Sequence, residues 1–163
     1  MATDVKPEHI GSLWQQHRRG REKLPGWLFR LPLMELALAS TGLQPGDCVR
    51  QGMLPLLNQT LNSLVLAGNN LTGPDILNCF ALYNFSIPTL DLSSNPLAFE
   101  LSTSQLPPYT QFLDLSHCLL HGPIPTKFPI SLEELYLTNN TLSGCIRSFL
   151  QGLDRFLGSI FGL

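Results

Sequence analysis

The chain has 163 residues, of which 44% are hydrophobic and 13% are charged, and its formal net charge is −2. The charged fraction is about half of the ~25% that is typical of soluble proteins. A nearly neutral chain has no electrostatic basis for binding nucleic acid or anionic lipid, so we expect neither as a partner. No run of about 18 apolar residues occurs, and the sequence therefore predicts no membrane span.

Residues 1–23 differ in composition from the residues that follow them. They contain the basic cluster HRRGREK at positions 17–23 and further charged residues before it. They lack the apolar centre of a secretory signal peptide. We expect this segment to be solvated and poorly ordered, and by itself it leaves an intracellular location open.

An eleven-residue pattern, L-x-x-L-x-L-x-x-N-x-L, recurs five times within residues 24–147. The copies span residues 33–43, 61–71, 87–97, 110–120 and 132–142, and the first is the weakest. Their central leucines follow one another at steps of 28, 26, 23 and 22 residues. Repeats of 20–29 residues with this pattern are typical of leucine-rich repeats.

Each copy predicts a short strand followed by a bend. The x-L-x-L-x core alternates between two faces, so its leucines point inward and stack on those of neighbouring turns. One repeat cannot bury its leucines alone, and about three stacked turns are needed. The predicted fold is an α/β solenoid, a leucine-rich-repeat horseshoe segment of about five repeats with a short-stranded parallel concave sheet and few helices.

The ninth position of the pattern predicts a structural ladder. A side chain at the bend can hydrogen-bond the backbone groups of adjacent turns that the bend leaves unpaired. We expect Thr41 to be a poorer substitute in the first copy, and Cys118 to serve as a small buried donor. The predicted ladder residues are Asn69, Asn95, Cys118 and Asn140.

The residues after the strands suggest a particular kind of repeat. Leu71-Thr-Gly73-Pro, Leu120-His-Gly122-Pro-Ile-Pro125 and Leu142-Ser-Gly144-Cys-Ile146 follow the pattern L-x-G-x-I-P in whole or in part. The stretch 24–146 thereby resembles the plant-type extracellular leucine-rich repeat of receptor-like proteins and receptor kinases, although residues 97–100 depart from it. The chain lacks that family's cysteine-bearing N-terminal cap and kinase motifs, so it looks like a fragment.

The resemblance implies a function in recognition. Such proteins bind proteins, peptides or small hormones with the concave face, often in defence or development, outside the cell or at the plasma membrane. A protein or peptide ligand is therefore the expected partner, and a co-receptor is a further candidate. Two other interpretations stay open: an inhibitor of a cell-wall polysaccharide-degrading enzyme, and a non-functional gene fragment.

Sequons give an independent indication of secretion. An Asn-rich repeat generates some Asn-x-Ser/Thr triplets through its own pattern, which weakens the signal. The candidate glycosylation residues are Asn58, Asn70, Asn84 and Asn139.

The residues that flank the inward leucines are the candidate ligand contacts. They are expected on the solvent side of the sheet, in columns whose neighbours lie about 4.8 Å apart. Two aromatic side chains beside two aspartates resemble an interaction hot spot for a basic or hydroxyl-bearing partner. The candidates are Val65, Asp91, Phe112, Asp114, Glu134, Tyr136 and Thr138.

Other chemistry is disfavoured by the same pattern. Asp91 and Asp114 belong to the repeat and imply no cleft for acid/base catalysis. Cys118 is expected inward and His117 elsewhere, which argues against a shared metal. We therefore expect no enzyme activity, no metal and no cofactor. The four cysteines, Cys48, Cys79, Cys118 and Cys145, allow three disulfide pairings among which the sequence does not choose.

Residues 148–163 are apolar and interrupted by three glycines. They are predicted to be either a truncated repeat or a makeshift cap over the last turn. Without a cover, the leucines of that turn would be exposed.

Overall fold

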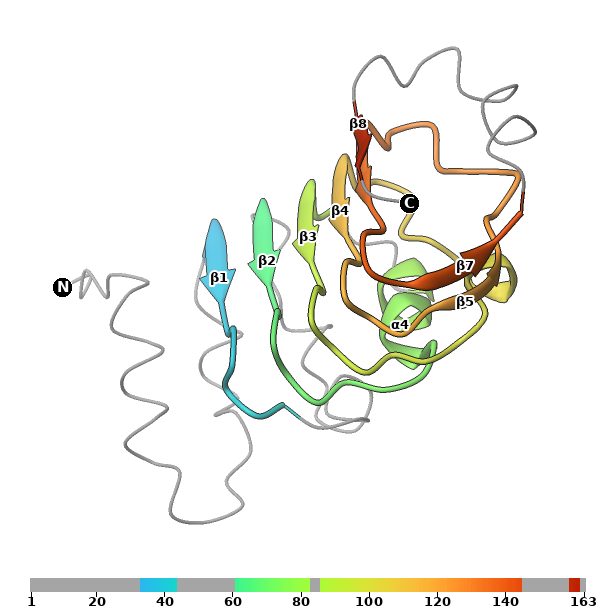
Figure 1. The fold of residues 1–163 in the computed structure, drawn as a ribbon. Coiled ribbons are helices and arrows are strands. Elements are labelled where there is room, and N and C mark those ends of the chain that lie inside the picture. The colour runs from blue at the N-terminus through green and yellow to red at the C-terminus, as the bar shows by residue number, and fades with distance from the viewer. Residues whose placement is uncertain (1–32, 44–60, 83–85, 145–158, 162–163) are drawn as a thin grey trace, which may run out of the picture.

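The computed structural model describes residues 33–43, 61–82, 86–144 and 159–161 (Figure 1). The N-terminal segment 1–23, the candidate sequons at Asn58 and Asn84, and Cys48 and Cys145 lie outside these residues. No helix among the described residues is long and apolar enough to cross a membrane.

The main sheet of the described residues has six strands, all parallel, in the order β1-β2-β3-β4-β6-β8. Each strand has three residues and carries the central leucine of one copy of the pattern, except the last. The strands are β1 Glu35–Ala37, β2 Ser63–Val65, β3 Thr89–Asp91, β4 Phe112–Asp114, β6 Glu134–Tyr136 and β8 Ser159–Phe161. The predicted solenoid with a short-stranded parallel sheet is confirmed.

The register of the sheet stacks equivalent positions of the repeat. Leu36 pairs with Leu64, which pairs in turn with Leu90, and the row continues through Leu113 to Leu135. All five of these side chains are buried, as are the second leucines of the strand motif. These two columns supply ten of the 23 buried hydrophobic residues of the described core. Burying one leucine contributes about 1.5–3 kcal/mol.

Strand β8 comes from the C-terminal segment 148–163. It pairs with β6, with Leu135 opposite Ile160, and so adds a sixth strand beyond the five that the pattern predicted. Residues 145–158, which connect it to the last pattern copy, lie outside the described residues.

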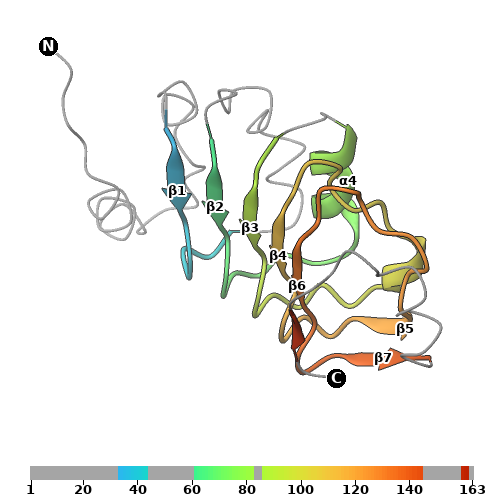
Figure 2. The same cartoon turned by 90° about the horizontal axis from the view of Figure 1, so that it is seen from above.

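The opposite side of the solenoid is built from different elements, which Figure 2 shows across from the strands. Helix α4 Asp75–Leu82 and the 3-10 turn η2 Leu101–Thr103 follow β2 and β3. Strands β5 His121–Pro123 and β7 Thr141–Ser143 form a second, parallel sheet. Few helices were expected, and the two helical segments named here are short, with eight residues in α4 and three in η2.

Gly122 of β5 shows why the L-x-G pattern requires glycine. Its φ is +77°, a left-handed conformation that side chains rarely adopt. A Cβ atom added there would lie only 2.4 Å from Cγ of Glu100. Glu100 of the preceding turn forms an isolated parallel β-bridge with His121. The glycine therefore permits the two turns to approach each other closely.

The ninth-position asparagines bond the backbone of two turns at once. The buried Asn95 side chain donates from Nδ2 to Leu92 O of its own turn at 2.9 Å and to Leu66 O of the preceding turn at 3.0 Å. Its Oδ1 accepts the N–H of Leu71 at 3.1 Å. Asn69 and Asn140 repeat the same arrangement in their turns.

Cys118 supplies only half of this arrangement. Its Sγ donates to Leu92 O at 3.3 Å, the carbonyl that an asparagine there would bond. A thiol is a weak acceptor compared with an amide oxygen. The N–H of Leu97, which occupies the place of Leu71 in its own turn, donates instead to Asn95 O at 2.8 Å. The next residue, Ala98, has φ of 48°, so the backbone conformation differs where the acceptor is missing.

The bend before each ladder residue is left-handed. The N–H groups of four of these residues donate to carbonyls of the following turn at 2.8–2.9 Å. This conformation turns the next side chain into the ladder. The residues, with φ from 54° to 64°, are Ser40, Gly68, Ser94, His117 and Asn139.

Replacing Asn95 by alanine tests the ladder. Asn95→Ala leaves the buried N–H of Leu71 without its acceptor and removes one of the two side-chain donors to each of Leu66 O and Leu92 O. We expect the free energy of unfolding to fall by about 1–3 kcal/mol. Denaturant titration measures it. Asn62→Ala, at an exposed asparagine one turn earlier, should change stability by less than about 0.5 kcal/mol. Equal losses in both variants would contradict the ladder's role.

The Cys118 thiol should be inert in the folded protein. It is fully buried and free of any disulfide, and burial raises its pKa to about 11, with Asp114 and Asp91 adding to the increase. Reaction requires the thiolate, which at pH 8 is then about one molecule in a thousand. We expect iodoacetamide to modify Cys118 at least about 100-fold more slowly in the native than in the guanidinium-unfolded chain, measured by peptide mass spectrometry. Rapid native modification would show that the ladder opens.

Candidate functional site

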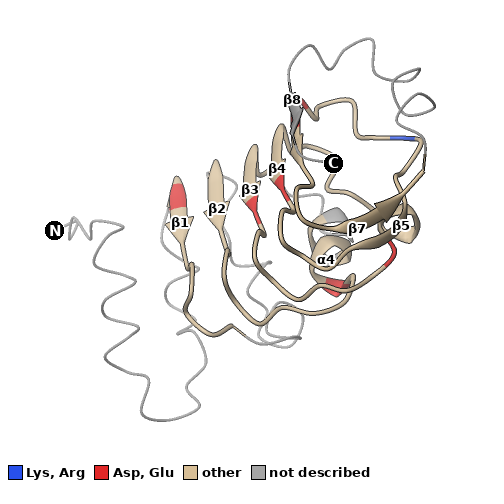
Figure 3. Cartoon of the chain, viewed as in Figure 1, with Lys and Arg blue, Asp and Glu red and all other residues tan. Residues whose placement is uncertain are grey.

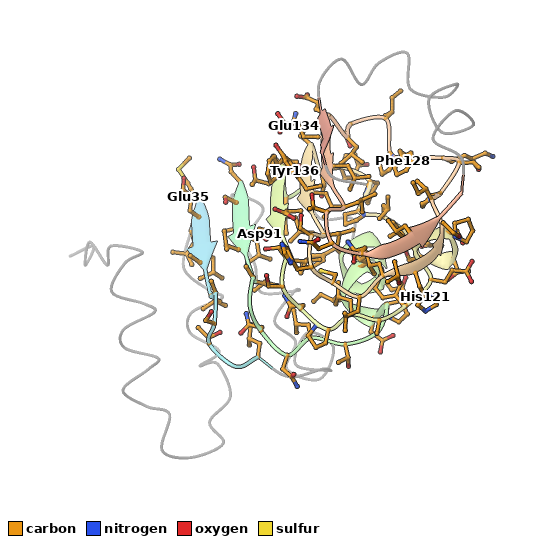
Figure 4. All side chains as sticks on the ribbon, in the orientation of Figure 1. Glu35, Asp91, His121, Phe128, Glu134 and Tyr136 are labelled. Carbon is orange, nitrogen blue, oxygen red and sulfur yellow. The ribbon has the colours of Figure 1, made fainter. Side chains whose placement is uncertain are left out.

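The solvent side of the main sheet is an ordered array of side chains, which we call the concave face. On each of the strands β1, β2, β3, β4 and β6 the central leucine is buried and its two neighbours are exposed or half-buried. Figure 4 shows Glu35, Asp91 and Tyr136 on the sheet side of the molecule and His121 on the side of β5. The concave face consists of Glu35, Ala37, Ser63, Val65, Thr89, Asp91, Phe112, Asp114, Glu134 and Tyr136.

Six of the seven candidate ligand contacts lie on this face, and all seven are half-buried. Thr138 does not lie on the concave face, because it follows β6. Its carbonyl accepts the N–H of His117 at 2.8 Å. Val65 lies on β2, two strands away from Phe112. The other candidates gather on β3, β4 and β6.

An aromatic pair on β4 and β6 belongs to this group. The rings of Phe112 and Tyr136 have centroids 5.1 Å apart and are tilted by 40°, a favourable arrangement for two rings. The Tyr136 hydroxyl donates to Oε2 of Glu134 at 3.0 Å. This hydrogen bond is the main reason why the pKa of Tyr136 lies above its ordinary value, and burial and the charges of Glu134 and Asp114 raise it further.

The two aspartates have a local structural function. Oδ1 of Asp91 accepts the N–H of Ser93 at 2.9 Å, and Oδ1 of Asp114 accepts the N–H of Ser116 at 2.8 Å. A side-chain bond to the backbone two residues on is the usual Asx arrangement at a bend. The repeated L-D-L-S sequence is explained by this bond, and each carboxylate keeps its second oxygen for other contacts.

The residues that suggested a metal are not brought together. His117 is exposed beside Asn139, with the ring nitrogens 3.3 Å from Nδ2 of that residue. Cys118 points into the core, and His121 belongs to β5 on the opposite side. Within the described ranges, no three His, Cys, Asp or Glu residues are grouped so that they could hold a metal ion.

The charged residues of the described part are mostly acidic, although the formal net charge of the whole chain is only −2 (Figure 3). Among the described residues, Lys127 is the single Lys or Arg, and it follows β5. Four of the carboxylates lie on the concave face, which is therefore acidic. The described carboxylates are Glu35, Asp75, Asp91, Glu100, Asp114, Glu133 and Glu134.

Two candidate glycosylation residues are described, and both lie off the concave face. Asn70 and Asn139 flank ladder residues on the bend that follows the strands, and both are exposed. The hydroxyl of Thr141, the third residue of the second sequon, donates to Leu120 O at 3.0 Å.

Comparison with known proteins agrees with the fold. The family model described as Leucine Rich Repeat matches residues 109–129 and 131–153. No curated protein matches the chain. Two repeats are thus identified independently of the structure, and the first includes Phe112 and Asp114 while the second includes Glu134 and Tyr136. The chain carries leucine-rich repeats that stack as a parallel-stranded solenoid.

Proposed function

We propose that this protein is a receptor-like recognition module that binds an extended segment of another protein on the concave face. The observation that carries the proposal is the half-exposed Phe112–Tyr136 pair on β4 and β6 of that face. Aromatic residues dominate binding energies at protein interfaces, because they bury large areas and lose little side-chain entropy.

The rigidity of the sheet supports binding rather than chemistry. The leucines beneath the face are buried and the strand backbones are paired, so the outward side chains stand in a fixed array. Side chains that are already positioned lose less entropy when a partner binds. Three of the four carboxylates on this face accept hydrogen bonds from backbone N–H groups or from the Tyr136 hydroxyl, which gives them structural partners.

The dimensions of the face suit a peptide. The five strands β1, β2, β3, β4 and β6 span about 19 Å, because neighbouring strands lie about 4.8 Å apart. An extended peptide rises about 3.3 Å per residue, so a segment of about six residues would cross all five. The candidate contacts on β3, β4 and β6 would hold the part of it that crosses the last three of these strands.

The proposal includes an extracellular location. Asn70 and Asn139 are exposed on the bend, where attached glycans would leave the concave face accessible. The resemblance of the segments after the strands to extracellular plant-type repeats supports the same location. Defence or developmental signalling is the corresponding biological setting.

Selected peptides would test the binding function. A displayed library of random twelve-residue peptides is panned on the full chain, and affinities are measured by biolayer interferometry. We expect Phe112→Ala together with Tyr136→Ala to weaken the selected peptides at least about tenfold, equivalent to about 1.4 kcal/mol. The melting temperature should change little, because both side chains are only half-buried.

Ser102→Ala is the matched control, because Ser102 is exposed on η2 on the far side of the solenoid. It should leave peptide affinity unchanged. Peptides that bind the double variant and the native chain equally well would refute recognition by the concave face.

The mass of the native protein tests the location. We expect an endoglycosidase to reduce it, because the exposed sequons would be occupied in the secretory pathway. Peptide mapping should then find the modification at Asn70 or Asn139 among the described residues. A native mass equal to 18.1 kDa before treatment would argue against secretion.

A further inference from the structure

Two aromatic and two acidic side chains alternate on adjacent strands of the concave face. Phe112 and Asp114 are the outward residues of β4, and Glu134 and Tyr136 are those of β6. The register pairs Phe112 with Glu134 and Asp114 with Tyr136. Each ring therefore has a carboxylate beside it along its strand and another across the strands. We call these four residues the aromatic-acidic square.

A further carboxylate extends the square. Asp91 of β3 pairs in register with Asp114, so two like charges are neighbours on one face. Like charges directly opposite one another are unfavourable, and a positive partner would offset that repulsion. The single basic residue of the described part of the chain, Lys127, follows β5 and not a strand of this sheet. The compensating charge is thus missing from the described solenoid.

Building on the proposed function, we propose that the aromatic-acidic square binds an arginine side chain of a basic peptide segment. The guanidinium plane lies against the Phe112 and Tyr136 rings and donates hydrogen bonds to Asp114 and Glu134. A cation over an aromatic face is attracted by the ring, and arginine adds planar stacking to that attraction. Asp91 attracts the next basic residue of the same segment.

The hydrogen-bonding state of the carboxylates fits this ligand. Oδ1 of Asp114 is held by the Ser116 N–H, and Oε2 of Glu134 is held by the Tyr136 hydroxyl. These bonds orient both carboxylates, and each retains acceptor capacity on its second oxygen. A guanidinium has five donors in a fixed plane and can reach two carboxylates while stacked. The ammonium of lysine is compact and strongly hydrated, so it gains less from the rings.

Matched peptides test this proposal directly. The probes are three fluorescein-labelled seven-residue peptides in which glycines alternate with three arginines, three lysines or three citrullines. Citrulline has nearly the shape of arginine without its charge. By fluorescence anisotropy with the full chain at low salt, we expect the arginine peptide to bind at least threefold more tightly than the lysine peptide and at least tenfold more tightly than the citrulline peptide. Raising NaCl from 50 to 300 mM should weaken it.

Charge-removing variants identify the site. Asp114→Asn keeps an oxygen that accepts the Ser116 N–H, and Glu134→Gln keeps one that accepts the Tyr136 hydroxyl. Together they should weaken the arginine peptide at least tenfold with an unchanged melting temperature. Glu100→Gln removes one negative charge on the opposite side, beside Gly122, and should change the affinity by less than twofold.

Four results would overturn the proposal. Equal binding of the arginine and citrulline peptides would remove the role of charge, and equal binding of the arginine and lysine peptides would remove that of the guanidinium plane. Unchanged affinity of the arginine peptide for the double carboxylate variant would show that it binds elsewhere.

Library peptides that depend on both aromatic residues but contain no arginine would refute this inference while leaving the proposed function intact. If no peptide depends on the concave face, the proposed function itself fails.

Discussion

The structure depends on buried hydrogen bonds between ladder side chains and the backbone of successive turns. Each short strand is followed by a bend whose carbonyl and N–H groups would otherwise be buried without partners, at a cost of about 1–3 kcal/mol each. One asparagine amide satisfies groups in its own turn and in the preceding turn, as Asn95 does. Stacking of the leucines then follows, because the ladder fixes the spacing and the register. Among the described residues, no buried side-chain N or O atom lacks a partner.

The residues that stabilise the solenoid differ from most of those that would contact a partner. Inward leucines and the ladder hold the backbone, so the outward positions can vary in sequence without loss of the core. Asp114 belongs to both sets, because one carboxylate oxygen accepts the Ser116 N–H at the bend while the residue is half-buried on the concave face. Such a residue is oriented before any partner arrives, which lowers the entropic cost of binding. The same reasoning applies to Glu134, whose carboxylate is held by Tyr136.

Departures from the repeat are also explained by the ladder. Cys118 donates as an asparagine would but is a weak acceptor, and the neighbouring turn changes its backbone at Leu97 and Ala98. That turn lacks the glycine of the L-x-G pattern, and η2 follows it. The turn that lacks both the asparagine acceptor and this glycine follows a different backbone path at Leu97 and Ala98, while β3 before it keeps its register.

The sequence by itself determined the solenoid, the five strand positions and the burial of their leucines, because each depends on a periodic pattern of apolar and polar residues. It also placed Phe112, Asp114, Glu134 and Tyr136 on one face, since alternation along a strand is local. Only the tertiary structure decided how these residues meet. The register between β4 and β6, the contact of the two rings and the hydrogen bond of Tyr136 to Glu134 depend on the stacking of separate turns and on side-chain rotamers. The addition of β8 likewise depends on pairing with β6, because its segment carries no copy of the repeat pattern.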